Sequence, residues 1–155
     1  MAYIQNNTND VECIFCHVQN CDDGFENLII YRGDFSFVIL NRYPYTSGHL
    51  MVVPYLHKQN LDEYHPETRA ELMELTAHSL RVLREIYHAQ GFNVGANIGS
   101  AAGAGIPKHF HFHVVPRWEG DTNFMSAIGD TRIVPEALEE SYRRIRRAWQ
   151  LTPGD

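Results

Sequence analysis

The chain has 155 residues, 44% of them apolar and 21% charged, which fits one globular domain (residues 1–155) with its own hydrophobic core. Its 13 basic and 19 acidic residues give a formal net charge of −6, which disfavours non-specific binding to nucleic acid or to anionic membranes. No apolar stretch approaches the ~20 residues of a membrane span, and residues 1–11 are polar and lack the features of a secretory signal, so we expect a cytoplasmic protein with a flexible N-terminal tail.

The pattern of apolar residues predicts five short strands and two helices. Branched and aromatic residues dominate 27–31 and 35–40, a predicted hairpin, and Pro54 ends a third strand at 49–54. A helical pattern begins at Pro66 and continues to about residue 90, where Gly91 ends it. Two further strands are predicted at 92–98 and 109–115, and a second helix at 135–149. This order indicates an α+β fold with an antiparallel sheet of about five strands. The predicted apolar face of the long helix contains Leu72, Met73, Leu75, Leu80, Leu83, Ile86 and Tyr87.

All three cysteines, Cys13, Cys16 and Cys21, lie near the N-terminus. An odd number in a chain without a secretory signal argues against a disulfide framework. Two residues separate Cys13 from Cys16, a spacing that lets two thiolates bind one metal ion from a tight turn. Two half-buried thiols or a redox pair are the alternatives.

Histidine is unusually frequent, with nine residues, and three of them alternate with apolar residues at 109–115. Strict alternation predicts a strand on which His109, His111 and His113 share one face, about 6.5 Å apart along the strand, with Phe110 and Phe112 on the other. Such a face suits two kinds of chemistry. The three imidazoles can hold a catalytic zinc ion, or one neutral imidazole can attack phosphorus as a nucleophile while a neighbour assists the leaving group.

These residues resemble the histidine-triad (HIT) superfamily of nucleotide hydrolases and transferases, whose motif His-φ-His-φ-His-φ-φ matches residues 109–115. The similarity runs from Cys13 to Trp118 and includes the segments at 40–41, 48–54 and 97–105. The stretch 116–124 and the helix that follows resemble a bacterial branch that includes diadenosine tetraphosphate phosphorylases.

The resemblance implies a role for each matching residue. His111 is the nucleophile that becomes nucleotidylated, His113 contacts the phosphate or leaving group, and His49 is a fourth histidine beside the triad. Asn41 holds ribose hydroxyls and Asn97 lines the phosphate pocket, although without the resemblance both read as ordinary turn or strand-end residues. Gly103 and Gly105 belong to a small-residue loop at 99–105 whose backbone N–H groups approach phosphate oxygens.

The resemblance also implies a structural zinc site with four ligands, namely Cys13, Cys16, His57 and His109. A closed four-ligand site is structural rather than catalytic, and no organic cofactor is expected. This leaves Cys21 as the unassigned thiol, and His17, His65, His78 and His88 as surface or packing residues.

One part of the family pattern is missing. Many members have Gln and Ser or Thr shortly before the first triad histidine, where this chain has Gly105 and Ile106. Ser100, Lys108 and Arg117 are the candidate replacements as phosphate contacts.

The resulting hypothesis is cleavage of a nucleotide phosphoanhydride, such as that of a dinucleoside polyphosphate, with phosphate or water as acceptor. A non-catalytic nucleotide-binding or scaffolding module is the rival from another class. Homodimerisation follows from the resemblance alone. Four arginines of the last helix, Arg143, Arg144, Arg146 and Arg147, are interpreted as favourable charges near a helix C-terminus rather than as a nucleic-acid patch.

Overall fold

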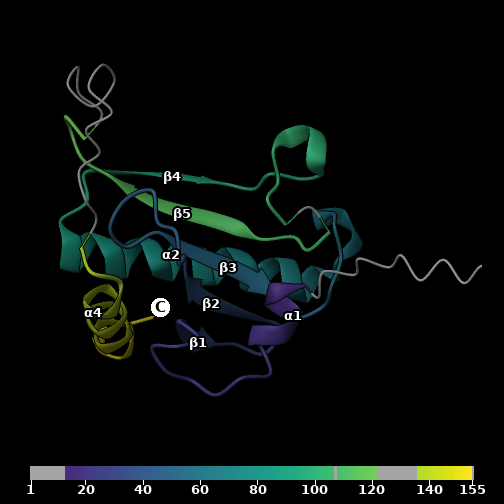
Figure 1. Cartoon of the computed structure of the whole chain (residues 1–155), viewed down its shortest axis with the longest axis horizontal. Helices are drawn as coiled ribbons and strands as arrows, with labels where there is room; N and C mark the ends of the chain where they lie inside the picture. Colours follow the sequence, from purple (N-terminus) through teal and green to yellow (C-terminus); the bar gives the residue numbers. More distant parts are fainter. Residues whose placement is uncertain (1–12, 107, 122–135, 155) are drawn as a thin grey trace, which may run out of the picture.

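A five-stranded antiparallel sheet organises the computed structural model, which describes residues 13–106, 108–121 and 136–154 (Figure 1). Along the sheet the strands stand in the order β1-β2-β3-β5-β4, and each neighbouring pair is antiparallel. The predicted α+β class with an antiparallel sheet is therefore confirmed. The strand bounds are β1 Ile29–Arg32, β2 Ser36–Leu40, β3 Leu50–Pro54, β4 Gly91–Gly95 and β5 Phe112–Arg117.

The helices pack mainly on one side of this sheet. The long helix α2, Pro66–Tyr87, crosses behind β2, β3 and β5, and α4, Leu138–Leu151, packs on α2 and β1 (Figure 1). The predicted extension of α2 to residue 90 is wrong, because His88 adopts a left-handed conformation and ends the helix. Within the predicted apolar face, Met73 is 56% exposed and is the residue that does not belong to the core side. Three short helices complete the described part: α1 Ile14–Val18, and the 3-10 turns η1 Leu61–Glu63 and η2 Ser100–Ala102. Among the described helices none has the length and apolar character needed to cross a bilayer.

Two strand predictions were too long at the ends nearest the histidines. β5 begins at Phe112 instead of His109, because its first pair with β3 is Phe112 with Val52. Before that point, the N–H of Phe110 donates to the carbonyl of Lys58, outside the ladder. β4 ends at Gly95, so Asn97 lies in the loop that leads to η2. Because β4 ends early and β5 begins late, the backbone of His109, His111 and Asn97 is irregular at this end of the sheet.

The arginines of α4 act through ion pairs rather than through the helix dipole. The last turn of α4 contains no basic residue, so the predicted placement near the helix C-terminus is wrong. Arg144 binds Glu136, Arg146 binds Asp23 and Arg143 binds Glu140 within the described residues. Three of the four guanidinium groups are thus engaged inside the chain, which agrees with the choice against a nucleic-acid patch.

A polar cluster around Glu136 anchors the start of the last helical region to the loop at 41–48. The Glu136 carboxylate accepts hydrogen bonds from the hydroxyls of Tyr87 (2.6 Å) and Ser141 (2.8 Å), and its backbone N–H donates to Ser47 Oγ at 2.8 Å. Gly48 has a φ of 82°, and a Cβ there would lie 2.9 Å from the Tyr87 ring, so only glycine fits this close approach. The loop that precedes β3 is therefore held from the helical side of the molecule.

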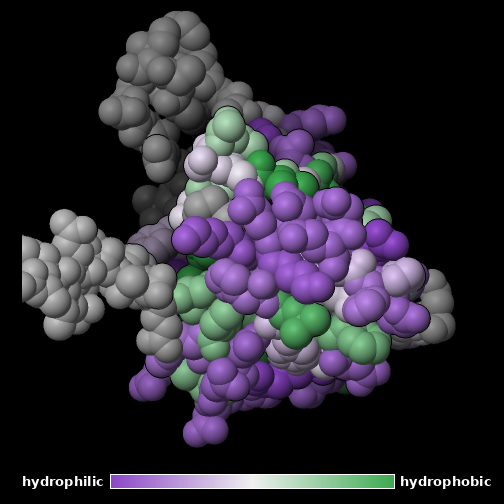
Figure 2. All heavy atoms as spheres, turned by 90° about the vertical axis from the view of Figure 1, so that its right-hand side faces the viewer, coloured by the Kyte–Doolittle hydropathy of each residue, from purple (hydrophilic) through white to green (hydrophobic). Residues whose placement is uncertain are grey.

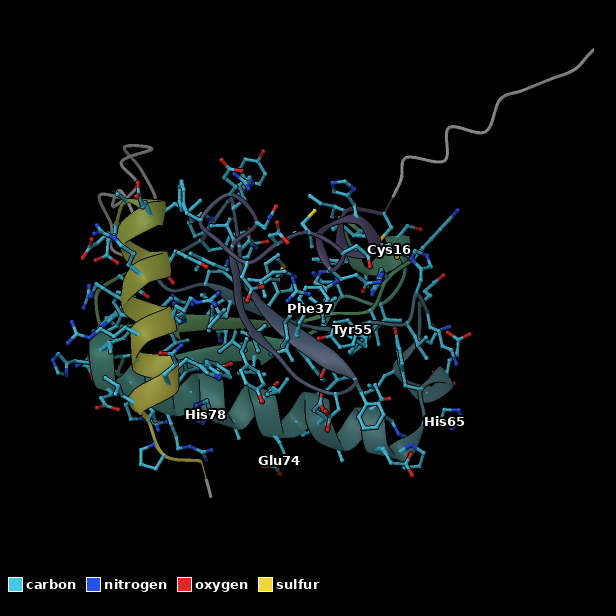
Figure 3. The ribbon with its side chains drawn as sticks, turned by 90° about the horizontal axis from the view of Figure 1, so that it is seen from below. Cys16, Phe37, Tyr55, His65, Glu74 and His78 are labelled. Carbon is cyan, nitrogen blue, oxygen red and sulfur yellow. The ribbon has the colours of Figure 1, made fainter. Side chains whose placement is uncertain are left out.

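The four histidines interpreted as surface or packing residues lie apart from the triad. His65 and His88 are exposed, and His78 packs its ring on Trp149 at 4.4 Å between ring centroids. Figure 3 places His65 and His78 along α2, away from Cys16. His17 lies 3.8 Å from Cys21 through Nε2 and Sγ, on the exposed side of α1.

Candidate active site and metal centre

Four side chains from three distant segments converge beside the N-terminal end of β5. Cys13 and Cys16 come from the start of α1, His57 from the loop after β3, and His109 from the segment before β5. Their ligand atoms all lie within 4.8 Å of one another. This brings together all four residues of the predicted metal site. Figure 2 views the end of the molecule that carries α1 and η2, where hydrophilic residues cover most of the surface.

Four of the six distances between ligand atoms in this cluster are close to those around a tetrahedral ion. His109 Nδ1 lies 3.3 Å from Cys13 Sγ, 3.5 Å from Cys16 Sγ and 3.2 Å from His57 Nδ1. Cys16 Sγ lies 3.3 Å from His57 Nδ1. In a tetrahedron with bonds of ~2.3 Å to sulfur and ~2.0 Å to nitrogen, ligand atoms stand about 3.3–3.8 Å apart. Two thiolates and two imidazoles are also the donor set that zinc prefers, so the residues present fit the ion.

A backbone carbonyl fixes the orientation of His109. Its Nε2–H donates to the Pro54 carbonyl at 2.8 Å, which leaves the lone pair of Nδ1 directed at the cysteines. Metal-binding histidines generally have such a partner on the second ring nitrogen, because it sets the tautomer and the ring plane. The side chain of His109 is 1% exposed, so this orientation is fixed by packing as well.

His49 and His113 form a hydrogen-bonded pair whose direction can be worked out atom by atom. The backbone N–H of Tyr45 donates to His49 Nδ1 at 3.2 Å, so a neutral His49 carries its proton on Nε2. His49 Nε2 lies 2.9 Å from His113 Nδ1 and donates to it. A neutral His113 then carries its proton on Nε2, the nitrogen turned away from His49. The hydrogen bond from the Tyr45 N–H to His49 therefore determines that His113, on β5, presents an N–H donor.

His111 has the opposite polarity. Its Nδ1 lies 2.9 Å from the carbonyl oxygen of His109 and donates to it, so the unprotonated nitrogen of the ring is Nε2. The rings of His111 and His113 meet edge to face with centroids 4.9 Å apart, and Phe15 of α1 packs on His111 at 5.0 Å. A lone pair on His111 and a donor on His113 are therefore held side by side.

Burial keeps these imidazoles neutral. Burial is the main cause that lowers the pKa of His49 to about 3 and that of His113 to about 4, and the neighbouring histidines lower both pKa values further. The pKa of His111 is also lowered by burial, and its hydrogen bond to the His109 carbonyl opposes this. Neutral imidazole is the form that can attack an electrophile near pH 7.

The lowered pKa values predict how stability depends on pH. His49 and His113 have folded pKa values below the ordinary value of 6.5, so they are protonated first in the unfolded chain. Their stabilising contribution is complete above about pH 6.5 and is lost as the pH falls towards 4, at up to about 1.4 kcal/mol per pH unit for each histidine. Urea unfolding at pH 7, 6 and 5 measures this slope. In a His49→Gln variant, the pH dependence of the unfolding free energy should fall by the contribution of one histidine. An unchanged slope would contradict the lowered pKa of His49.

Asn41 lies at the edge of the histidine pair. Its Oδ1 accepts the backbone N–H of residue 43 at 2.9 Å, which closes an Asx turn, and its Nδ2 lies 3.4 Å from His49 Nε2. The side chain is half-buried. The turn-forming interpretation is confirmed, and the same amide lies beside His49, whereas a role for Asn41 in substrate binding stays a prediction.

The predicted phosphate loop is only partly placed against the histidines. Figure 1 shows the η2 loop at the end of the sheet where β5 begins, but Asn97, Gly103 and Gly105 are exposed there. Gly103 has a φ of 80°, which explains the need for glycine without a ligand. Among the described residues, Asn97, Gly103 and Gly105 make no hydrogen bond to His111. Their phosphate contacts remain predictions.

Of the three candidate replacements for the missing phosphate contacts, Arg117 is already engaged. Its guanidinium binds both oxygens of the Asp121 carboxylate, at 2.6 and 2.8 Å, and also donates to Asn93. Ser100 and Lys108 are exposed. The segment 122–124 of the predicted similarity, Pro135 and the tail at 1–11 lie outside the described residues.

The three triad histidines do not converge on one metal ion. His109 points its Nδ1 at the cysteine cluster, whereas the Nδ1 of His111 is used by a backbone carbonyl and that of His113 by His49. The alternative of a catalytic zinc ion bound by the triad is therefore disfavoured. The predicted strand is wrong at His109 and His111, which precede its first residue Phe112. The rings of His111 and His113 nevertheless lie side by side with centroids 4.9 Å apart, and Phe15 contacts both His109 and His111.

Three contributors to the site escaped the sequence prediction. The Tyr45 N–H and the Pro54 carbonyl are backbone groups, and no pattern of residue types predicts that they contact the histidines. Phe15 is one of the two apolar residues between Cys13 and Cys16, and its ring packs against His109 and His111, which joins α1 to the triad.

The fold and the alternating histidines together define a histidine-triad protein. The chain belongs to the HIT domain family, whose profile matches residues 25–120. It is 41% identical over 128 residues to an AP-4-A phosphorylase of Mycobacterium tuberculosis, which covers 83% of this chain and 66% of that relative, just under two thirds of its length.

Two solved structures extend the comparison. A Zn-bound histidine triad family protein from Mycobacterium smegmatis superposes with a TM-score of 0.72 at 34% identity, covering 90% of this chain and 94% of the other. A hypothetical histidine triad nucleotide-binding protein from Sulfolobus tokodaii has a TM-score of 0.72 at 27% identity, with 90% and 93% covered.

Proposed function

We propose that this protein cleaves the phosphoanhydride of a dinucleoside polyphosphate, such as diadenosine tetraphosphate, by transferring a nucleotidyl group through His111 to inorganic phosphate. The observation that carries the proposal is the pairing of an unprotonated nitrogen on His111 with an N–H donor on His113. The similarity to an AP-4-A phosphorylase favours this substrate class and this acceptor.

In the first step, His111 Nε2 attacks the α-phosphorus, a P–N bond forms and the P–O bond to the leaving polyphosphate breaks. The imidazole becomes positively charged, and its Nδ1–H donates more strongly to the His109 carbonyl. His113 Nε2–H donates a hydrogen bond to the leaving oxygen. It need not give up its proton, because a polyphosphate leaves readily as an anion.

In the second step, an acceptor oxygen attacks the same phosphorus and the P–N bond breaks, which returns His111 to its neutral state. Inorganic phosphate as acceptor gives a nucleoside diphosphate, and water gives a monophosphate. Transfer of adenylyl from diadenosine tetraphosphate to phosphate yields ADP and ATP, with all atoms balanced. Because both displacements occur at one phosphorus, the second acceptor must enter the space from which the first leaving group departed.

We also propose that the cysteine–histidine cluster holds a structural zinc ion. Cys13, Cys16, His57 and His109 are its ligands, and the Zn-bound relative supports the choice of metal. The ion crosslinks α1 to the segment that precedes β5, and its binding free energy adds to folding free energy. The rings of His109 and Phe15 transmit this restraint to His111.

Asn41 is proposed to bind the ribose beside the histidine pair, and the loop at 99–105 to contact the phosphates. A homodimer in the cytoplasm remains the expectation for the assembly.

Product analysis tests the reaction and its acceptor. Diadenosine tetraphosphate is incubated with the full-length protein, with and without inorganic phosphate, and the nucleotides are separated by anion exchange. ADP and ATP in equal amounts, formed only with phosphate, are the expected products. AMP and ATP without phosphate would make water the acceptor.

Trapping separates an enzyme from a nucleotide-binding module. A substrate labelled at the α-phosphorus should leave acid-labile label on the denatured protein, because a phosphoramidate is stable at high pH and hydrolyses in acid. A binding module would retain no label after denaturation, and neither nucleotide product would form.

A further inference from the structure

The loop at 41–48, between β2 and β3, carries two exposed tyrosines of which only one touches the site. Tyr43 is 81% exposed and Tyr45 is 72% exposed. The Tyr45 ring lies 4.6 Å from the His49 ring and 6.3 Å from the His113 ring, between centroids, and is close to parallel with His113 at 20°. Within the described part of the chain, Tyr43 makes no ring contact with a histidine. One face of Tyr45 thus covers the histidine pair while most of its surface meets solvent.

The backbone that carries Tyr45 is firmly held. Its own N–H donates to His49, Thr46 Oγ1 donates to the Pro116 carbonyl at 2.9 Å, and Ser47 Oγ accepts the Glu136 N–H at 2.8 Å. An aromatic ring on an anchored backbone needs little further ordering before a ligand binds, so less conformational entropy is lost. The hydrogen bonds of the loop therefore hold the Tyr45 ring in its exposed position.

The position of Tyr45 identifies the part of the substrate that meets it. Its ring contacts His49 and His113, whose N–H faces the leaving group in the proposed function, and no ring contact joins it to His111 among the described residues. The nucleotide that departs, rather than the one transferred, passes beside this ring. Aromatic side chains bind bases of any sequence by stacking, because every base has a π face.

We propose that Tyr45 is the stacking platform for the nucleobase of the leaving nucleotide, and that it selects substrates with a second nucleoside over simple nucleoside polyphosphates. This inference rests on the proposed function and deepens it.

Two substrates that share the transferred adenylyl group test the proposal. Diadenosine tetraphosphate has a second base and adenosine 5′-tetraphosphate does not. For wild type, Tyr45→Phe, Tyr45→Ala and Tyr43→Ala, kcat/KM is measured on both. Where the second compound turns over slowly, its inhibition constant against the first replaces kcat/KM in the comparison. Substitution at residue 45 keeps the backbone N–H that donates to His49.

The Tyr45→Ala variant should lose about 10- to 100-fold in its preference for the dinucleotide, the range that one base–aromatic stack accounts for. Tyr45→Phe should retain the preference because the ring remains, and Tyr43→Ala should leave the ratio unchanged. An equal loss on both substrates would mean that the ring only shields the histidines, and would overturn the proposal. A matching loss in Tyr43→Ala would also overturn it. If the wild-type chain converts neither compound, the proposed function itself has failed.

Discussion

Replacing His111 by alanine is expected to abolish turnover, with kcat reduced by at least about 10⁴-fold, because no other described group offers an unprotonated nitrogen beside the His113 donor. Single-turnover assays with the α-labelled dinucleotide measure the loss and show whether label still reaches the protein. The variant should retain its metal content, since His111 is not among the four clustered ligands. It should also retain nucleotide binding, because the other residues of the candidate site are unchanged.

A matched change at the neighbouring histidine gives the comparison. His113→Ala removes one hydrogen-bond donor to the leaving group and is expected to cost about 10²- to 10³-fold in kcat. Label should still accumulate on this variant, more slowly. Near-normal turnover in His111→Ala, or label on a different residue, would show that the nucleophile is misassigned. A small loss in thermal stability is expected in His111→Ala, because Phe15 loses a packing partner.

The sequence was a good guide wherever periodicity and burial agree. The alternation around Val114, which is fully buried and pairs with Leu50, predicted β5 correctly over residues 112–115, although the strand continues to Arg117. The Pro66 start of the long helix was also predicted correctly. Periodicity failed before Phe112, where the backbone has no strand partner. His109 and His111 continue the alternating pattern, but their backbone is irregular. Side-chain spacing cannot reveal which backbone groups still have a strand partner.

The site shows the same division. The cysteine spacing and the histidine motif pointed to Cys13, Cys16 and the triad. The resemblance added His49 and His57 and assigned the residues to two separate centres. What divides the triad physically is a set of backbone groups. The Pro54 carbonyl turns His109 towards the cysteines, the His109 carbonyl sets the tautomer of His111, and the Tyr45 N–H sets that of His49. Every residue has a backbone carbonyl and every residue except proline has a backbone N–H, so the placement of these groups follows from the fold and not from the sequence motif.

Removing the proposed zinc ion is expected to be the largest perturbation of stability. The proposed ligands come from residues 13–16, 57 and 109, so the ion closes loops that span most of the sheet. At a free metal concentration 100 to 1,000 times the dissociation constant, binding contributes about 3–4 kcal/mol. For a chain of this length, that corresponds to a fall in Tm of about 6–16 °C on chelation. Differential scanning calorimetry with and without a chelator measures the fall, and elemental analysis of the purified protein counts the metal.

Cysteine substitutions separate metal binding from general damage to the N-terminal segment. Cys16→Ser should lower both the metal content and the Tm, whereas Cys21→Ser, five residues away and also half-buried, should change neither. Loss of the ion should also slow adenylylation of His111, because Phe15 and the His109 ring then lose the restraint that places them against it. The slowing should be partial, since the ion binds no reacting atom. Complete loss of turnover on chelation, with full recovery on adding metal and an unchanged Tm, would instead make the ion catalytic and contradict the separation of the two centres.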